Sequence, residues 1–278
     1  MYAAEKNGII CERQRIAMEE KIYNAHAHIF PAKISDKAVD AIGAFYQIPM
    51  QEHGTAEDLI ADGSQIGVSR YLVCSTATKA NQVQSINRFI AEETRLHPEF
   101  DGFGSLHPEA ENIAQETERI IALGLKGIKL HPDFQEFNID DPAAYPIYEA
   151  AEGRLPILFH TGDDRYEFSR PHRLLRIVEK FPKLTVIAAH LGGYQCWDQV
   201  HIYIGHPRIY IDTSSALMFV PPEKASALIH AHGIERVLFG TDFPMWKHKE
   251  ELQRFNRLEL TAQERKQVLY DNARNLIK

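Results

Sequence analysis

Eight short runs of apolar or β-branched residues recur along the chain, and each is followed by a stretch of helical character. This alternation is typical of β/α units that build a parallel sheet. After the second run, successive runs begin about 24 to 30 residues apart, which is the usual length of such a unit. The runs begin near Ile22, Tyr71, Phe100, Gly127, Pro156, Leu184, Arg208 and Arg236. The gap between the first two runs is about 49 residues, which predicts an extra loop or helix over the mouth formed by the strand ends.

Eight such units favour a (β/α)8 TIM barrel, and a chain of 278 residues with 44% hydrophobic content is long enough for one. A doubly wound open sheet fits less well, because no Gly-x-Gly-x-x-Gly motif follows the first run. We expect one α/β barrel domain over residues 21–278, preceded by an N-terminal extension over residues 1–20. An amphipathic helix is predicted over 109–123, and a final helix over 261–277 with a capping box at its start.

Composition argues against several classes of protein. The formal net charge of −7 gives no basic surface for nucleic acid or for an anionic membrane. The three cysteines, Cys11, Cys74 and Cys196, are odd in number and far apart, which argues against a disulfide framework and favours the cytoplasm. There is neither a signal-like apolar stretch at the start nor a run of 18 apolar residues. The sequence therefore predicts no nucleic-acid partner and no membrane association.

Polar residues stand at the carboxyl ends of four of the predicted strands. His26 and His28 end the first, His160 the fifth, His190 the sixth and Asp242 the eighth. Side chains repeat every two residues along a strand, so His26 and His28 face the same way. Taken singly, each residue is better explained as a hydrogen-bonded histidine or, for Asp242, a helix cap. All strand ends meet at one mouth in a barrel, and the four positions together favour a metal centre.

The chemistry of these side chains narrows the choice of ion. Imidazole nitrogens with one carboxylate suit a borderline-soft divalent metal and leave coordination positions open for water and substrate. We expect one divalent metal ion, with Zn²⁺ as the first candidate and Mn²⁺ as an alternative on the same ligands.

These strand-end motifs resemble those of the amidohydrolase superfamily, in the branch called amidohydrolase family 2. The resemblance spans residues 21–278. This branch is similar in layout to aminocarboxymuconate semialdehyde decarboxylase. It rests on the segments 24–28, 127–132, 159–162, 189–193 and 239–244. The resemblance implies that His26, His28, His160 and Asp242 hold one metal ion and that His190 lies beside the metal-bound water. It also implies a second role for Asp242, as the catalytic base.

The predicted fourth strand departs from the two-metal members of the superfamily. Those members usually bridge their metals with a carboxylated lysine or a glutamate at this position, where this chain has Lys129 and His131. We expect Lys129 to be a charged group facing the barrel or the substrate, with carboxylation as the alternative. His131 is expected either to contact substrate or only to tie down its loop.

Candidate substrate residues follow the fifth, sixth and eighth strands. Arg165 and Arg170 can clamp a substrate carboxylate, because a guanidinium binds that group with two parallel hydrogen bonds. The alternative for both is an ion-pair cluster with neighbouring acidic residues of the same loop. Tyr194 and Trp246 can wall a pocket for a flat compound, or they can simply pack at the rim.

These residues lead to a first functional hypothesis and two alternatives. The first is a metal-dependent hydrolase that cleaves a small polar or carboxylated amide, ester or lactone with activated water. The second is a metal-dependent, non-oxidative decarboxylase of an aromatic or unsaturated acid, and the third is a non-catalytic binding barrel. A serine hydrolase is excluded, because the sequence has no Gly-x-Ser-x-Gly motif. We expect a small-molecule substrate, and the family resemblance implies a possible homodimer.

Overall fold

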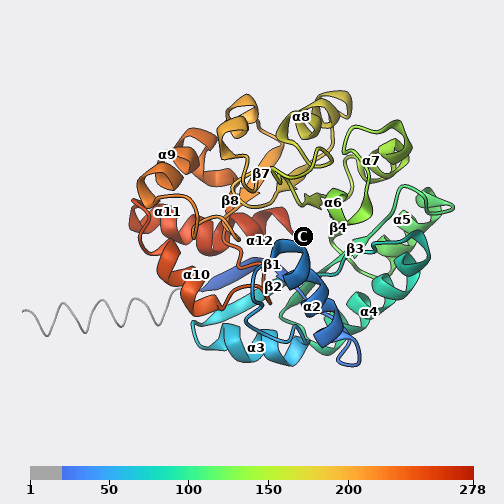
Figure 1. Ribbon diagram of the computed structural model, residues 1–278, viewed down its shortest axis with the longest axis horizontal. Helices are drawn as coiled ribbons and strands as arrows, with labels where there is room; N and C mark the ends of the chain where they lie inside the picture. Colours follow the sequence, from blue (N-terminus) through green and yellow to red (C-terminus); the bar gives the residue numbers. More distant parts are fainter. Residues whose placement is uncertain (1–20) are drawn as a thin grey trace, which may run out of the picture.

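The computed structural model describes residues 21–278, so the predicted extension over residues 1–20 lies outside the described residues. Eight parallel strands pair in chain order to form a single sheet that curls into a barrel (Figure 1). They are β1 (Ile22–His28), β2 (Val68–Cys74), β3 (Phe100–Ser105), β4 (Gly127–Leu130), β5 (Ile157–Phe159), β6 (Val186–Ala188), β7 (Ile209–Asp212) and β8 (Val237–Leu238). The predicted (β/α)8 barrel is confirmed.

The barrel closes where the first and last strands meet. β8 is only two residues long, and the chain beyond it continues the contact with β1. The Ala25 N–H donates to the carbonyl of Phe239 (2.7 Å), and the Asp242 N–H donates to the carbonyl of His26 (2.9 Å). The His28 N–H donates to the carbonyl of Phe243 (2.7 Å). The seam of the barrel therefore includes three residues of the predicted metal site, His26, His28 and Asp242.

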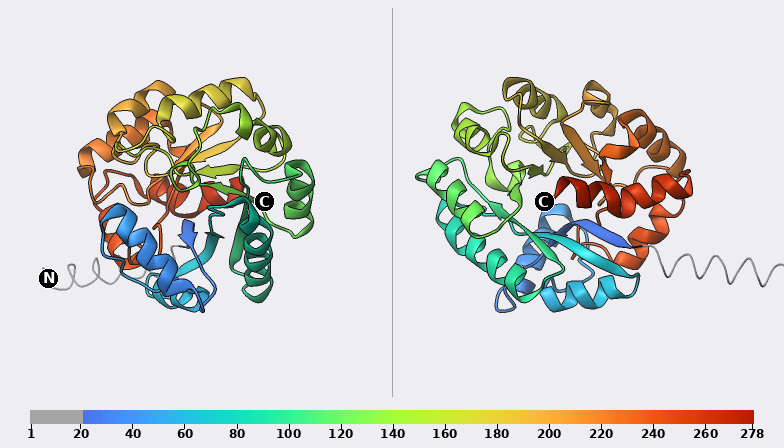
Figure 2. Two further views of the ribbon diagram at one scale, coloured as in Figure 1. Left: turned by 45° about the vertical axis from the view of Figure 1, so that its right-hand side comes forward. Right: turned by 180° about the vertical axis from the view of Figure 1, so that it is seen from behind.

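Helices between the strands surround the barrel (Figure 2). The α-helices are α2 (Ser35–Tyr46), α3 (Ala56–Ser64), α4 (Val83–Leu96), α5 (Ile113–Ala122), α6 (Pro132–Gln135), α7 (Tyr145–Ala151), α8 (Pro171–Lys180), α9 (Pro222–His232), α10 (His248–Phe255), α11 (Ala262–Lys266) and α12 (Asn272–Leu276). The 3₁₀ helices are η1 (Ala80–Gln82), η2 (Pro142–Ala144), η3 (Trp197–Tyr203) and η4 (Ile234–Arg236), and η5 (Gln267–Asp271) is a π-helix.

Both helices predicted from the sequence are present. α5 falls within the predicted 109–123, with Ile113, Thr117 and Ile120 buried on one face. The predicted final helix is formed by α11, η5 and α12, and Thr261 and Glu264 make the expected capping box. The long first gap contains α2 and α3, and α2 lies across one end of the barrel (Figure 1). The view from behind shows α12 across the other end.

Two groups of buried apolar side chains stabilise the barrel. One fills the space between the strands and the surrounding helices. The other lies inside the barrel, where alternate strand residues such as Phe103, Leu158 and Ile187 point inward. Ala273 and Ile277 belong to this inner group, which shows that the C-terminal segment closes the end of the barrel opposite α2. Below the strand ends, the barrel is thus a packed core and not a channel.

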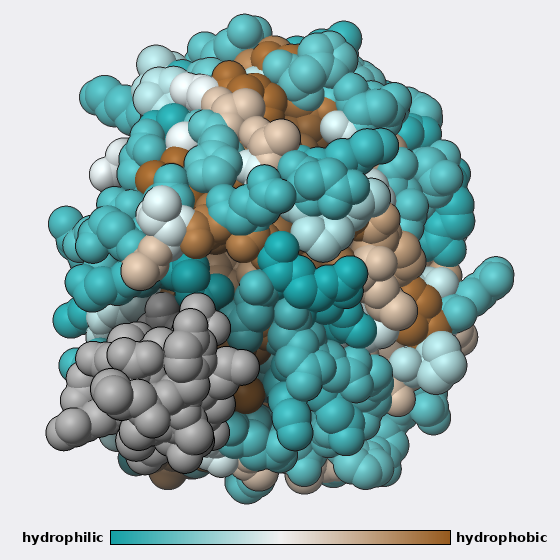
Figure 3. Space-filling view, turned by 90° about the vertical axis from the view of Figure 1, so that its left-hand side faces the viewer, coloured by the Kyte–Doolittle hydropathy of each residue, from teal (hydrophilic) through white to brown (hydrophobic). Residues whose placement is uncertain are grey.

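The face shown in Figure 3 is mostly hydrophilic, with hydrophobic side chains in narrow, interrupted strips. Within residues 21–278, no helix has the length and apolar character needed to cross a bilayer. The cytoplasmic location expected from the cysteines stays a prediction.

Candidate active site

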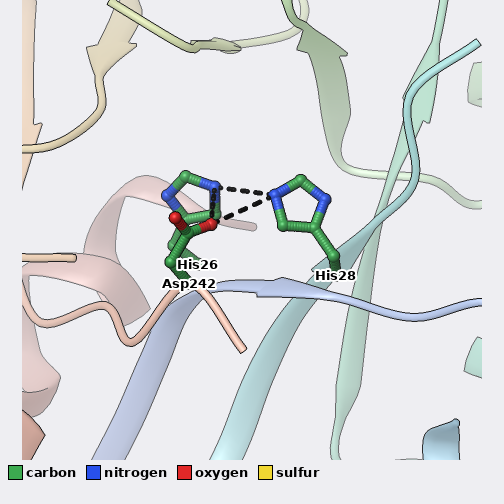
Figure 4. A group of neighbouring side chains, drawn as sticks. All are labelled: His26, His28 and Asp242. Carbon is green, nitrogen blue, oxygen red and sulfur yellow. Dashed lines mark hydrogen bonds and ion pairs between the residues drawn. The ribbon is translucent and has the colours of Figure 1, made fainter. Parts of the chain in front are cut away.

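The strand ends bring two histidines and one aspartate together. His26 and His28 come from β1, and their Nε2 atoms lie 3.2 Å apart (Figure 4). Asp242, which follows β8, places Oδ1 at 3.5 Å from His26 Nε2 and 3.3 Å from His28 Nε2. One ligand atom from each residue lies within 4.8 Å of the other two. This arrangement can hold a divalent metal ion between the three atoms.

Asp212 fixes the orientation of His26. Its Oδ2 lies 2.9 Å from His26 Nδ1, and both side chains are fully buried. Because Nδ1 donates its hydrogen to this carboxylate, Nε2 keeps its lone pair and directs it at His28 and Asp242. Burial, helped by the nearby Lys129 charge, lowers the pKa of His26 to about 4. His26 is therefore neutral at pH 7, which is the form that binds a metal.

Lys129 lies directly beside this group. It is the third residue of β4, it is buried, and its Nζ is 3.1 Å from His26 Nε2. Burial lowers the pKa of its ammonium, although Asp242 and Asp212 oppose the effect. The side chain faces the inside of the barrel at the bottom of the cavity described below.

His160 and His190 form a second pair next to the first group. His190 Nδ1 lies 3.0 Å from the carbonyl of Ser214, so Nδ1 carries the hydrogen and Nε2 accepts one from His160 Nδ1 (3.0 Å). The other nitrogen of His160, Nε2, lies 3.6 Å from a carboxylate oxygen of Asp133. His160 is thus outside the three-atom group, and its role as a metal ligand stays a prediction.

Backbone strain gathers at the same place. His190, Ser215 and Asp242 all have positive φ values, of 63°, 49° and 57°. Such conformations are unfavourable for residues with a Cβ and persist only where surrounding contacts enforce them. Ser215 donates to Asp242 Oδ2 (2.6 Å) and accepts from Trp246 Nε1 (2.9 Å), which holds the aspartate in place.

A cavity of about 1160 Å³ opens above these residues. Its polar floor includes His28, Lys129, His131, His160, His190 and Asp242. Its walls are mainly apolar and come from α2 and α4, with Ala38, Ile42 and Phe45 on one side and Ile86 and Phe89 on the other. The insertion between β1 and β2 therefore forms a wall of the cavity, as the long first gap in the sequence predicted.

The two arginines predicted to clamp substrate do not line the cavity. Arg165 pairs with Asp163 (2.7 Å) and donates to the carbonyl of Phe45 (2.7 Å). Arg170 pairs with Glu167 (3.2 Å). Both arginines thus make the ion pairs that were the alternative expectation, and direct binding of substrate by either one stays a prediction.

The other predicted substrate residues divide in the same way. Lys129 and His131 line the cavity, whereas Tyr194 and Trp246 do not. The ring of Tyr194 packs edge-on against Tyr46 at 5.7 Å, and Trp246 reaches Asp242 only through Ser215. These two aromatic residues lie behind the residues that face the cavity.

Sequence reasoning missed four residues of the site: Tyr46, Asp133, Asp212 and Ser215. Asp212 ends β7, so the strand-end criterion that selected the histidines applies to it equally. Asp133 is buried, which raises its pKa to about 7, and it lies just after the predicted fourth strand. Tyr46 ends α2 in the long insertion, where no pattern in the sequence indicated which residue would face the site.

Comparisons with known proteins identify the family of the chain. The family model described as Amidohydrolase matches residues 23–278. The chain is 28% identical over 200 residues to 2-amino-3-carboxymuconate-6-semialdehyde decarboxylase of Dictyostelium discoideum, a match that covers 58% of this chain and 56% of that protein. The chain therefore matches little more than half the length of this relative.

Solved structures show the same fold. The 5-carboxyvanillate decarboxylase of Sphingomonas paucimobilis superposes with a TM-score of 0.71 at 16% identity, covering 93% of this chain and 99% of that one. A dihydroxybenzoic acid decarboxylase of Polaromonas sp. JS666, solved with bound manganese and the inhibitor 2-nitroresorcinol, superposes with a TM-score of 0.72 at 17% identity. That match covers 92% of this chain and 96% of that one.

These comparisons overturn the first functional hypothesis. The relative and the two solved structures named above carry the names of decarboxylases. The hydrolase prediction was wrong, because one set of metal ligands serves both reactions and the sequence motifs report the ligands alone. The chain, with its barrel, its strand-end histidines and its match over residues 23–278, belongs to the amidohydrolase family, in the family 2 branch.

Proposed function

We propose that this protein is a metal-dependent, non-oxidative decarboxylase of an aromatic or unsaturated carboxylic acid. The observation that carries the proposal is the 28% identity to a decarboxylase over 200 residues. A second support is the cavity, because a polar floor beneath apolar walls suits a flat acid that binds with its carboxylate downward.

The proposed reaction breaks the bond between the carboxylate carbon and the substrate carbon. The electron pair stays on the substrate carbon, carbon dioxide leaves, and a proton takes its place. His26, His28 and Asp242, with His160 as the predicted fourth ligand, would hold the metal ion. Such an ion, when bound, supplies positive charge that holds the oxygen atoms of the substrate. The chain itself must orient the acid, keep water out and deliver the proton.

Asp242 and His190 are the proposed groups for proton transfer. Burial alone would raise the pKa of Asp242, but the neighbouring His26 and His28 hold it well below its usual range. Asp242 is therefore ionised and can take a proton from a hydroxyl group in the site and pass it to the substrate carbon. Burial lowers the pKa of His190, so its neutral ring, fixed by Ser214, can orient the reacting group.

The identity of the metal is part of the proposal. We propose one divalent ion per chain, with Zn²⁺ expected from the ligands and Mn²⁺ suggested by the Polaromonas structure. Elemental analysis of protein purified without chelator gives the number and identity of the ions. Two ions per chain would contradict a mononuclear site. The possible homodimer is tested separately by sedimentation of the same preparation.

The reaction is tested by measuring carbon dioxide release from 2,6-dihydroxybenzoate and 5-carboxyvanillate, with the protein loaded with Mn²⁺ or Zn²⁺. We expect release from at least one acid, without incorporation of solvent oxygen into the product. In Asp242→Asn, which keeps the shape of the side chain, we expect release to fall about 10²- to 10⁴-fold. Binding of both acids by metal-loaded protein without any carbon dioxide release would contradict the proposal for these substrates.

A further inference from the structure

Tyr46 is the last residue of α2, and its ring reaches from the insertion into the cavity. The ring centre lies 6.1 Å from that of His160 and 5.9 Å from that of Phe134. The hydroxyl oxygen is 2.9 Å from His131 Nε2. Tyr46 is therefore the point at which the covering helix meets the polar floor of the cavity.

The direction of the bond between Tyr46 and His131 follows from the other nitrogen of the ring. His131 Nδ1 accepts the backbone N–H of Phe134 (3.3 Å), so in the neutral ring the hydrogen is on Nε2. Nε2 therefore donates, and the Tyr46 oxygen accepts.

This leaves the hydroxyl hydrogen of Tyr46 available. Within residues 21–278, Tyr46 makes no side-chain hydrogen bond other than the one to His131. An ordinary tyrosine hydroxyl has a pKa of about 10 and therefore carries its hydrogen at pH 7. The phenol thus stays protonated and presents one donor to the cavity.

The position of this donor is fixed from outside the cavity. Arg165 donates to the carbonyl of Phe45, the residue before Tyr46, and Asp163 holds Arg165 through both carboxylate oxygens (2.9 and 2.7 Å). The Arg165 guanidinium also lies over the Tyr46 ring, at 5.5 Å from its centre. Arg165 therefore ties the end of α2 to the loop after β5 and is a positioning residue for Tyr46.

We infer that the Tyr46 hydroxyl donates a hydrogen bond to an oxygen of the bound carboxylic acid and thereby helps to determine which acids the site accepts. The inference rests on the proposed function for the class of ligand. The favoured acids carry a carboxylate or an adjacent hydroxyl oxygen on the side that faces α2. Acids without an oxygen there cover the phenol without offering it an acceptor, which costs free energy of binding.

The experiment measures equilibrium binding by calorimetry and does not depend on turnover. Mn²⁺-loaded wild type, Tyr46→Phe and Tyr166→Phe are titrated with 2,6-dihydroxybenzoate and with 5-carboxyvanillate. Tyr166 is the matched control, because its ring stacks on Phe45 at 5.5 Å but does not line the cavity. We expect Tyr46→Phe to bind the better of the two acids about 10- to 100-fold more weakly, and Tyr166→Phe to bind as wild type does.

A second variant tests the attachment of the helix. Arg165→Met removes the hydrogen bond to the Phe45 carbonyl but keeps the hydroxyl group of Tyr46. The hydroxyl is then less firmly positioned, so we expect a smaller loss of affinity in the same direction. Metal content and melting temperature are measured for each variant, and Phe keeps the ring packing of Tyr46. If Tyr46→Phe does not fold, Arg165→Met still tests the inference.

Two results would overturn the inference. One is equal affinity of wild type and Tyr46→Phe for both acids. The other is a wild type that binds neither acid, which would remove the ligand class on which the inference rests. Carbon dioxide release by wild type, with binding unaffected in Tyr46→Phe, would leave the proposed reaction standing and reject the role of Tyr46 alone.

Discussion

The carboxylate of Asp212 holds three groups of the site at once. Oδ2 accepts from His26 Nδ1, while Oδ1 accepts the backbone N–H of His190 (3.1 Å) and of Ser214 (3.0 Å). The carboxylate is fully buried, yet its pKa is lowered, because the neighbouring His26 and His190 outweigh the effect of burial. A residue that does not line the cavity thus determines which nitrogen of His26 faces the predicted metal position.

Asp212→Asn should weaken binding of Mn²⁺ or Zn²⁺ about 10- to 100-fold, because the amide is a poorer acceptor for His26 Nδ1–H. The measurement is titration of metal-free protein with each ion. Asp36→Asn is a matched control, since Asp36 makes an Asp–His pair of the same length (2.9 Å) with His53 on the surface. Equal metal affinity in the two variants would show that Asp212 has no part in orienting His26.

His232, at the end of α9, should make the protein sensitive to acid. It is buried, its Nε2 lies 2.8 Å from the carbonyl of Ile209, and burial lowers its pKa to about 4. The unfolded chain, with an ordinary histidine pKa of about 6.5, binds the proton first. The stability from neutral His232 is therefore present above pH 6.5 and is lost as the pH falls toward 4.

Between pH 7 and pH 5 this one group should cost about 2 kcal/mol of unfolding free energy. Urea denaturation at both pH values measures the loss, and His232→Gln should reduce it. His201→Gln, at an exposed histidine in η3, should leave the loss as in wild type. An unchanged loss in His232→Gln would place the acid sensitivity in other groups.

The loop after β5 depends on one glycine. Gly162 has a φ of +83°, and a Cβ there would lie 2.5 Å from the backbone nitrogen and oxygen of Tyr194. The Tyr194 N–H in turn donates to the carbonyl of Thr161 (2.7 Å). The loops that follow β5 and β6 therefore pack backbone against backbone, which holds His160 and His190 next to each other.

Gly162→Ala should lower the free energy of unfolding by about 2 to 4 kcal/mol, since it combines left-handed strain with a backbone clash. Gly67→Ala provides the comparison, because Gly67 has a similar φ of +77° but open space around the added Cβ. That variant should cost only about 1 to 2 kcal/mol. Denaturation curves for both measure the difference, and equal losses would mean that the loops move apart without cost.

The sequence was a good guide to elements whose pattern is local. The apolar spacing of α5 and the capping box at Thr261 lie within a few residues, so both could be predicted. His26, His28 and Asp242, which the structure brings together, could be selected because each lies at or just after the end of a predicted strand, although the same criterion missed Asp212. The contacts of α2 could not, because the side that it turns to the cavity depends on Arg165, which is 120 residues away from Phe45.

The reaction was harder to predict than the fold because it depends on the whole cavity. Barrel topology follows from eight repeated units, and the predicted metal ligands follow from that topology. The choice between hydrolysis and decarboxylation lies in how substrate is held above His28 and Asp242, and the walls there come from segments without distinctive motifs. The comparison with named decarboxylases favoured decarboxylation, which the motifs alone could not do.

Metal binding should stabilise the entire barrel, because its ligands lie on both sides of the seam between β1 and β8. An ion at 100 times its dissociation constant should add about 2.7 kcal/mol to the free energy of unfolding. Thermal unfolding with Mn²⁺ and with a chelator measures this gain, and His26→Ala should abolish it. A gain of the same size in His26→Ala would place the stabilising ion elsewhere.

The same seam sets an order of events during synthesis. His26 and His28 leave the ribosome early, whereas their carboxylate partner follows more than 200 residues later, after β8. A nascent chain that stops before Asp242 carries two histidines but lacks the third group that would hold an ion between them. We therefore expect metal capture at the predicted site to be a late step, which follows the release of Asp242 from the ribosome.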